Sequence, residues 1–170
     1  MTTDVTTDVT ASSTAQTALH HIALVCKDVA ATHRFYGELL GLQLVHTERT
    51  ELGDGYLRHF FYDLGDGSCI AFFELNGVGE PDSFDTAIST GLGLPAWVNH
   101  VALRATAEHV AEVRERFAAA GEPEPMVLRH GWSRSTYFTD PNGNLLELCV
   151  DTPGFVPDPA EAKRLLLEAG

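Results

Sequence analysis

Two histidines occupy matching positions in this chain. His21 opens the sequence HIAL and His100 opens the sequence HVAL, and each tetrapeptide is followed by a helical pattern and then by strand-like segments. A carboxylate, Glu147, comes late in the second repeat, within the segment YFTDPNGNLLE. Two imidazoles and one carboxylate are the donor set of a mononuclear metal site that keeps coordination positions open. His21, His100 and Glu147 are therefore candidate ligands of one divalent metal ion.

The elements that must position these residues form one unit written twice. In each copy the pattern predicts an apolar strand, a helix ended by glycine, a further strand and a two-stranded hairpin, in the order βαβββ. In the first copy these segments are 19–26, 29–40, 42–47, 56–62 and 68–75. In the second copy they are 97–105, 108–120, 125–129, 135–139 and 145–150. One such unit cannot bury both faces of its sheet, so the two units should share a core.

The chain accordingly divides into five parts. They are a disordered N-terminal tail at 1–18, a first module at 19–76, a linker at 77–95, a second module at 96–152 and a C-terminal extension at 153–170. The linker is rich in glycine and polar residues, and we expect a short helix in it near 82–89. We expect a second short helix in the extension near 160–168.

Side-chain alternation predicts which strand faces carry the chemistry. Each histidine shares a strand face with a small alanine two residues later, whereas the larger aliphatic residues occupy the opposite face and suit helix packing. If 140–144 is a five-residue loop, Tyr137 lies directly opposite Glu147 on the last hairpin, and opposed residues project to the same face. Tyr137 is therefore expected beside the metal, in contact with a bound substrate, or else as an ordinary strand aromatic.

Two further histidines are candidates for proton transfer. His130 has a side chain of suitable pKa and precedes the second hairpin, although a plain loop residue is the alternative. His59 points into the same cavity if the loop at 63–67 has five residues, and a register change of one residue would turn it out. Three aromatic side chains could line the pocket or simply pack in the core: Phe61, Phe73 and Trp132.

The composition excludes several classes of function. The net charge is −13, from 24 acidic and 11 basic residues, and such a field repels a phosphate backbone, so no nucleic-acid partner is expected. No apolar run is long enough to cross a membrane, and the first 18 residues do not resemble a secretory signal, so we expect a cytoplasmic protein. Cys26, Cys69 and Cys149 lie in apolar segments without CxxC spacing, which indicates reduced, buried thiols without a catalytic or metal-binding role.

The duplication, the two HxAL strand starts and the segment DPNGNLLE resemble the vicinal oxygen chelate superfamily over about residues 19–151. That superfamily contains glyoxalases, extradiol ring-cleaving dioxygenases, fosfomycin-resistance enzymes, epimerases and metal-free bleomycin-binding proteins. The resemblance implies an α+β fold in which two βαβββ modules form an incompletely closed, eight-stranded, barrel-like sheet around a metal site. Since the fold serves several chemistries, the function depends on the residues of the site.

The number of ligands separates the members of this superfamily. Glyoxalases and the related epimerases use four, with a late carboxylate or amide in each module, and the alignment of the two copies puts Ala71 at that position in the first module. Glu74 lies an odd number of residues further on, so it faces the other way unless a bulge brings it back as a fourth ligand. The favoured set is the three-ligand set of His21, His100 and Glu147.

The extradiol dioxygenases share this ligand pattern. Their signature runs from a histidine through a tyrosine to Asp-Pro-x-Gly and then the glutamate, and His130, Tyr137, the segment 140–143 and Glu147 match most of it. The chain departs from it at Thr136, where the signature has an aliphatic residue or phenylalanine. The segment 82–99 also lacks the acid/base histidine of that family, so His59 or His130 would have to replace it.

The favoured interpretation is an Fe(II)-dependent extradiol-type dioxygenase that acts on an aromatic diol, with Tyr137, His130 and His59 as catalytic candidates. The alternatives are a metal-dependent lyase, isomerase or transferase of the glyoxalase, epimerase or fosfomycin-resistance kind, and a non-catalytic binding protein of the bleomycin-resistance kind. Mn(II), Ni(II) and Zn(II) also accept this donor set. A homodimer is the expected assembly, and the modules could pair within one chain or between two chains.

Overall fold

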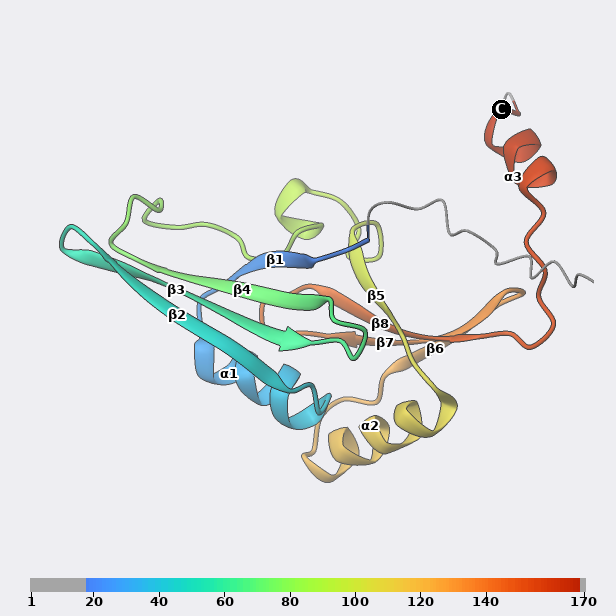
Figure 1. The fold of residues 1–170 in the computed structure, drawn as a ribbon, viewed down its shortest axis with the longest axis horizontal. Helices are drawn as coiled ribbons and strands as arrows, with labels where there is room; N and C mark the ends of the chain where they lie inside the picture. The colour runs from blue at the N-terminus through green and yellow to red at the C-terminus, as the bar shows by residue number, and fades with distance from the viewer. Residues whose placement is uncertain (1–17, 169–170) are drawn as a thin grey trace, which may run out of the picture.

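The computed structural model describes residues 18–168 of the chain, so the predicted N-terminal tail lies outside the described residues except for Ala18. Figure 1 shows two modules of similar shape followed by a helix that stands apart. The first module contains β1 (His21–Cys26), α1 (Val29–His33), η1 (Arg34–Leu39), β2 (Leu44–Leu52), β3 (Gly55–Asp63) and β4 (Cys69–Asn76). The second contains β5 (His100–Arg104), α2 (Ala107–Ala119), β6 (Met126–His130), β7 (Ser133–Thr139) and β8 (Leu145–Asp151). The remaining elements are η2 (Thr90–Leu92) and α3 (Pro159–Leu166).

The predicted fold class is confirmed, since each module has the order βαβββ and forms a four-stranded mixed sheet. The strand orders are β1-β4-β3-β2 and β5-β8-β7-β6, and in both sheets the first strand runs parallel to the last. No backbone ladder joins the two sheets within the described residues, so one chain does not form a continuous eight-stranded sheet. As a result β1 and β5, the strands that begin with the two predicted histidine ligands, are both edge strands.

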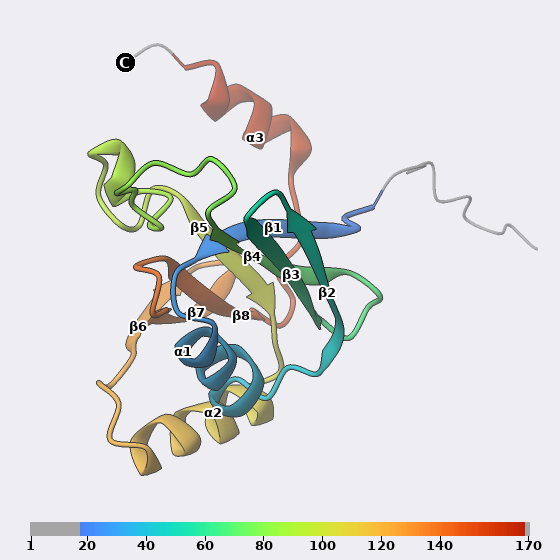
Figure 2. The ribbon, with the colours of Figure 1, turned by 90° about the vertical axis from the view of Figure 1, so that its left-hand side faces the viewer.

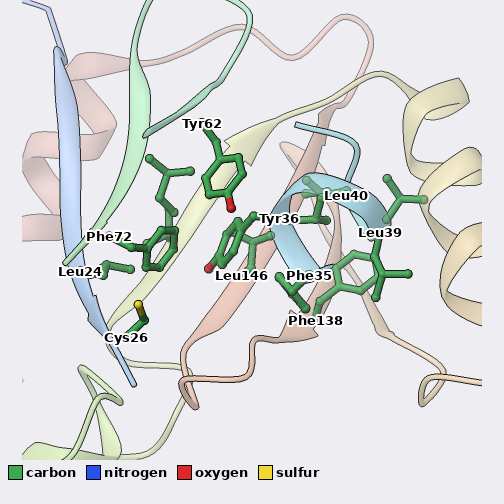
Figure 3. Packing of buried hydrophobic residues seen from close by; sticks show 14 of the residues in the cluster. Leu24, Cys26, Phe35, Tyr36, Leu39, Leu40, Tyr62, Phe72, Phe138 and Leu146 are labelled. Carbon is green, nitrogen blue, oxygen red and sulfur yellow. The ribbon is translucent and has the colours of Figure 1, made fainter. Parts of the chain in front are cut away.

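The shared core lies between the modules, as the duplication requires. Leu24 and Cys26 of β1 are buried there, which confirms that the aliphatic face of this strand is the packing face. In Figure 3 Tyr36 lies between Phe72 of the first sheet and Leu146 of the second, and its ring centroid is 4.6 Å from that of Phe72. Since alternate residues point to opposite faces, the histidine faces of both sheets are turned away from this core.

The first helix changes pitch half way. The N–H of Leu40 bonds to the carbonyl of Phe35, five residues back, so η1 is a π-helical continuation of α1. Its Tyr36 hydroxyl donates a 2.9 Å hydrogen bond to Asp140, which lies in the loop between β7 and β8. This contact anchors the loop that precedes Glu147 to the first module.

The prediction of a short helix near 82–89 is wrong. The N–H of Ala87 bonds to the Asp85 side chain and the N–H of Ile88 bonds to the side chain of Asn144, each over 2.9 Å or less. Because side-chain oxygens take these donors, the backbone has an alternative to helical hydrogen bonds. Of the described helices, none is both long and apolar enough to span a membrane.

Candidate functional site

The strand registers align the two modules residue by residue. Ala23 of β1 pairs with Ala71 of β4, and Ala102 of β5 pairs with Glu147 of β8. Ala71 and Glu147 therefore occupy equivalent positions, because each lies opposite the alanine that comes two residues after the histidine of its module. The first module thus offers no carboxylate at the position where the second module has Glu147.

His100 and Glu147 form a close pair. The His100 Nε2 lies 2.9 Å from Glu147 Oε2, and the His100 Nδ1 lies 2.9 Å from the carbonyl of Trp97. Because the carbonyl can only accept, Nδ1 carries the proton and Nε2 faces the carboxylate. A backbone carbonyl that fixes one ring nitrogen is the usual support of a metal-binding histidine. Either a proton on Nε2 or a metal cation must lie between these two groups, and the pair fits a metal ion.

The Glu147 carboxylate is buried yet held in its charged form. Its residue is only 4% exposed, and burial by itself opposes ionisation. The thiol of Cys149 donates to Oε1 over 2.7 Å, and this bond acts with Ser135, His100 and Tyr137 to hold the pKa of Glu147 below its ordinary value. The site therefore presents a carboxylate anion rather than a carboxylic acid.

Tyr137 lies directly opposite Glu147, as the five-residue loop predicts. Its hydroxyl shares a 3.1 Å hydrogen bond with His130 Nε2 at the end of β6, so the structure brings these two candidates together. Burial, together with the charge of Glu147, raises the pKa of Tyr137, whose hydroxyl is therefore protonated at neutral pH. The His130 ring stacks on Trp132 with centroids 6.0 Å apart, so this histidine is held in place rather than loose in a turn.

His21 belongs to a different cluster on the first sheet. Its Nδ1 lies 2.7 Å from that of His20, and its ring packs against Phe61 and His59 with centroids 5.5 and 6.1 Å away. In Figure 2 the strands β1 and β5 begin on opposite sides of the molecule. Over residues 18–168 no three His, Cys, Asp or Glu side chains gather as a metal site would require. A single chain thus unites two of the three predicted ligands.

His59 shares the face of His21 but pairs with Phe73 rather than with Ala71. The five-residue loop after β3 is 64–68, one residue later than expected, and this shifts the register of the hairpin by two residues. Its ring stacks on Phe73 with centroids 3.7 Å apart, and its Nδ1 lies 3.4 Å from Glu48. The ring is buried, its Nε2 has no hydrogen-bond partner in the described structure, and this burial lowers the pKa of His59 despite the nearby Glu48.

Glu74 lies on the opposite face of the first sheet. It pairs with Arg58 across the β3–β4 ladder, its carboxylate is 3.4 Å from that arginine, and the Tyr56 hydroxyl also donates to it. No bulge interrupts this ladder. The carboxylate that could have served as a fourth ligand is therefore engaged away from His21.

Comparisons with known proteins identify the fold family. The family model of the glyoxalase/bleomycin resistance protein/dioxygenase superfamily matches residues 18–148. This chain belongs to that superfamily. The match ends before α3, so the C-terminal helix lies outside the family domain. A search of curated proteins found no match.

Solved structures of the superfamily resemble the chain over most of its length. The fosfomycin resistance protein FosX from Listeria monocytogenes is 27% identical, covers 80% of this chain and 94% of its own, and has a TM-score of 0.54. The lactoylglutathione lyase from Agrobacterium tumefaciens is 24% identical, with coverages of 78% and 92% and a TM-score of 0.52. A glyoxylase/bleomycin resistance protein/dioxygenase domain from Frankia sp. EAN1pec is 18% identical, with coverages of 83% and 96% and a TM-score of 0.60.

The edges of the two superfamily modules expose large apolar side chains next to the histidines. Leu19, just before β1, is 60% exposed, and Trp97 and Val98, just before β5, are 67% and 41% exposed. A sheet edge also leaves unpaired backbone donors and acceptors that favour pairing with another strand. Both edges are therefore suited to an interface.

Basic side chains are scarce on the faces turned away from the core. By strand alternation, Arg104 is the one lysine or arginine that shares such a face with a predicted ligand in the strands β1 to β8. It is largely exposed and lies 3.3 Å from Asp151. Arg129 and Arg134 pair with each other on the opposite face of the second sheet. The site face is therefore poor in positive charge.

One residue in contact with Glu147, Cys149, was not predicted from the sequence. Its thiol contacts Glu147, and burial and this carboxylate raise its pKa. The spacing of two residues in one strand was the available signal, because it puts Cys149 on the face of Glu147.

Proposed function

We propose that the chain is an Fe(II)-dependent extradiol-type dioxygenase that opens the ring of an aromatic diol. The observation that carries the proposal is the hydrogen-bonded pair of Tyr137 and His130 directly beside His100 and Glu147. This pair supplies a proton donor and a proton acceptor next to the proposed metal position. The face offers little positive charge, which suits a substrate without a phosphate or phosphonate group.

The proposed ligands are His21, His100 and Glu147. When bound by two histidines and one carboxylate, Fe(II) supplies open coordination positions for both oxygens of a catecholate and for O2. The fixed Nδ1 of His100 and the ionised Glu147 fit this role, because a metal ligand must present a lone pair or a negative charge.

Tyr137 and His130 are the proposed proton-handling residues. A diol must lose protons as it becomes a dianion, and His130 is the imidazole within reach that can accept one. Tyr137, whose pKa is raised, keeps its proton and donates a hydrogen bond to an oxygen of the substrate. His59 is the proposed acid/base residue contributed by the first module, where its Nε2 is without a partner among the described residues.

We further infer that the ligand set is completed between two chains of a homodimer. The two histidine faces point away from the core of their own chain, and the histidines begin the two edge strands β1 and β5. Pairing of β1 from one chain with β5 from a second chain would join the two sheets into one of eight strands. It would also cover Leu19 and Trp97 and bring His21 of one chain toward Glu147 of the other.

A fosfomycin-resistance type of reaction is the second candidate, because FosX is 27% identical to this chain. One FosX structure holds Mn(II) and a dihydroxypropylphosphonic acid. A doubly charged phosphonate needs several cationic partners. Arg104, already close to Asp151, is a poor basis for such a site, so this candidate ranks below the dioxygenase.

The test is anaerobic loading of the purified protein with Fe(II), followed by oxygen uptake with catechol and with a phenyl-substituted catechol. We expect stoichiometric O2 consumption and a yellow ring-opened product. Tight binding of Mn(II) with turnover of fosfomycin, and no oxygen uptake with either diol, would overturn the proposal in favour of the second candidate.

A further inference from the structure

A buried polar chain supports the carboxylate of Glu147 from behind. The thiol of Cys149 donates to Glu147 Oε1 over 2.7 Å, and the Ser135 hydroxyl lies 3.7 Å from the same sulfur. The Ser133 hydroxyl continues the chain, 3.3 Å from that of Ser135. All four residues are buried. This row of polar side chains therefore connects the carboxylate to other buried groups rather than to solvent.

The two carboxylate oxygens of Glu147 have different partners. Oε1 receives the thiol hydrogen bond, whereas Oε2 faces His100 at 2.9 Å. A thiol keeps its proton at neutral pH and a carboxylate can only accept, so the direction of the bond from Cys149 to Glu147 is fixed. The bond holds the plane of the carboxylate so that Oε2 remains directed at the histidine.

The first module is an internal control for this interpretation. Its residue equivalent to Glu147 is Ala71, and the positions equivalent to Cys149 and Ser135 hold Phe73 and His59, which stack on each other. The module that carries the carboxylate has polar side chains at these two positions, whereas the module without it has a stacked aromatic pair there. The two modules share a fold, but the thiol is found in the module that has the carboxylate.

We propose that Cys149 is a positioning residue that orients Glu147 for metal binding. The proposal rests on the proposed role of Glu147 as a ligand, and it does not depend on which reaction the metal serves. Loss of a group that orients a metal ligand typically weakens metal affinity by about 10- to 100-fold. A hydroxyl at the same position keeps a donor, so Cys149→Ser should retain most of the affinity that Cys149→Ala loses.

The experiment is a calorimetric titration of the full-length, metal-free protein with Mn(II), which is stable in air and reports binding without turnover. The wild type is compared with Cys149→Ala, Cys149→Ser and Cys26→Ala, the last a second buried cysteine that contacts none of the proposed ligands. Thermal melting of each metal-free variant separates a loss of affinity from a loss of folding.

We expect a dissociation constant about 10- to 100-fold weaker for Cys149→Ala and close to wild type for Cys149→Ser and Cys26→Ala. Equal affinity in wild type and Cys149→Ala would overturn the positioning role. Equal weakening in Cys149→Ser and Cys149→Ala would also overturn it, since a retained donor would then not matter. Intact Mn(II) binding without oxygen uptake by the Fe(II) form would refute the proposed dioxygenase and leave the role of Cys149 standing.

Discussion

Two variants that each lack a metal ligand should regain metal binding when they share a dimer. His21→Ala removes the proposed ligand on β1, and His100→Ala removes the proposed ligand on β5. Under the proposed assembly, each site takes His21 from one chain and His100 with Glu147 from the other. A mixed dimer then has one site that lacks both histidines and one site that is complete.

The expected recovery follows from this geometry. Random re-association of equal amounts gives mixed dimers as half of all dimers, and half of the sites in them are intact, so metal content should recover to about one quarter of the wild-type value. The same fraction applies to any activity that depends on the metal. Recovery should be absent in either variant alone.

The assay unfolds the two variants together, refolds them, and measures tightly bound metal per chain by elemental analysis after gel filtration. Glu147→Gln mixed with His100→Ala is the matched control, because these ligands come from the same chain and no combination rebuilds a site. The wild-type protein refolded in the same way sets the reference value. Complete absence of recovery in dimers shown to be mixed, by an affinity tag carried on one variant only, would refute the two-chain site, and recovery in the control would refute the ligand assignment.

Four further predictions follow from single side chains. Glu147→Gln should abolish bound metal in elemental analysis, whereas Glu74→Gln should retain it because that carboxylate pairs with an arginine on the other face; equal losses would argue for a fourth ligand. Tyr137→Phe should keep the metal and lower kcat by about 100-fold or more, and an unchanged kcat would remove it from the mechanism. The lowered pKa of His59 means that the unfolded chain binds its proton more readily, so the free energy of unfolding should fall as the pH drops below about 6.5. Urea titrations should show that His59→Gln flattens this dependence, and an identical slope would contradict it. Tyr36→Phe removes a buried hydrogen bond and should lower the free energy of unfolding by about 1–3 kcal/mol in urea titrations, with no change expected in metal content.

Most of the fold was predictable because it depends on local periodicity. The alternation in the strands and the glycine stops fix the βαβββ order, and the loop at 140–144 fixes the register that sets Tyr137 opposite Glu147. The errors occur where side chains override the pattern. Asn144 takes a backbone donor that the expected helix near 82–89 needed, and the shifted loop of the first hairpin sets His59 against Phe73.

The candidate site was predictable in its parts but not in its assembly. Residue types and spacing select His100, Glu147 and Tyr137, and the structure brings these together within one sheet. The distance of His21 from them depends on how the two sheets pack, and that packing is decided by core side chains far apart in the sequence, such as Tyr36 and Phe72. The contact of Cys149 with Glu147 follows from alternation, but a thiol in an apolar strand carries no signal of its own.

In the proposed two-chain site, metal binding is linked to assembly. A metal ion that takes His21 from one chain and His100 with Glu147 from the other binds the dimer and not the monomer, so by mass action it stabilises the dimer, and dilution weakens the apparent affinity for metal. The exposed apolar residues beside β1 and β5 then have a second consequence, because a substitution such as Trp97→Ser that weakens the interface also weakens metal binding without touching a ligand. A site confined to one chain has neither property. The dependence of metal affinity on protein concentration therefore distinguishes the two architectures even before the substrate is known.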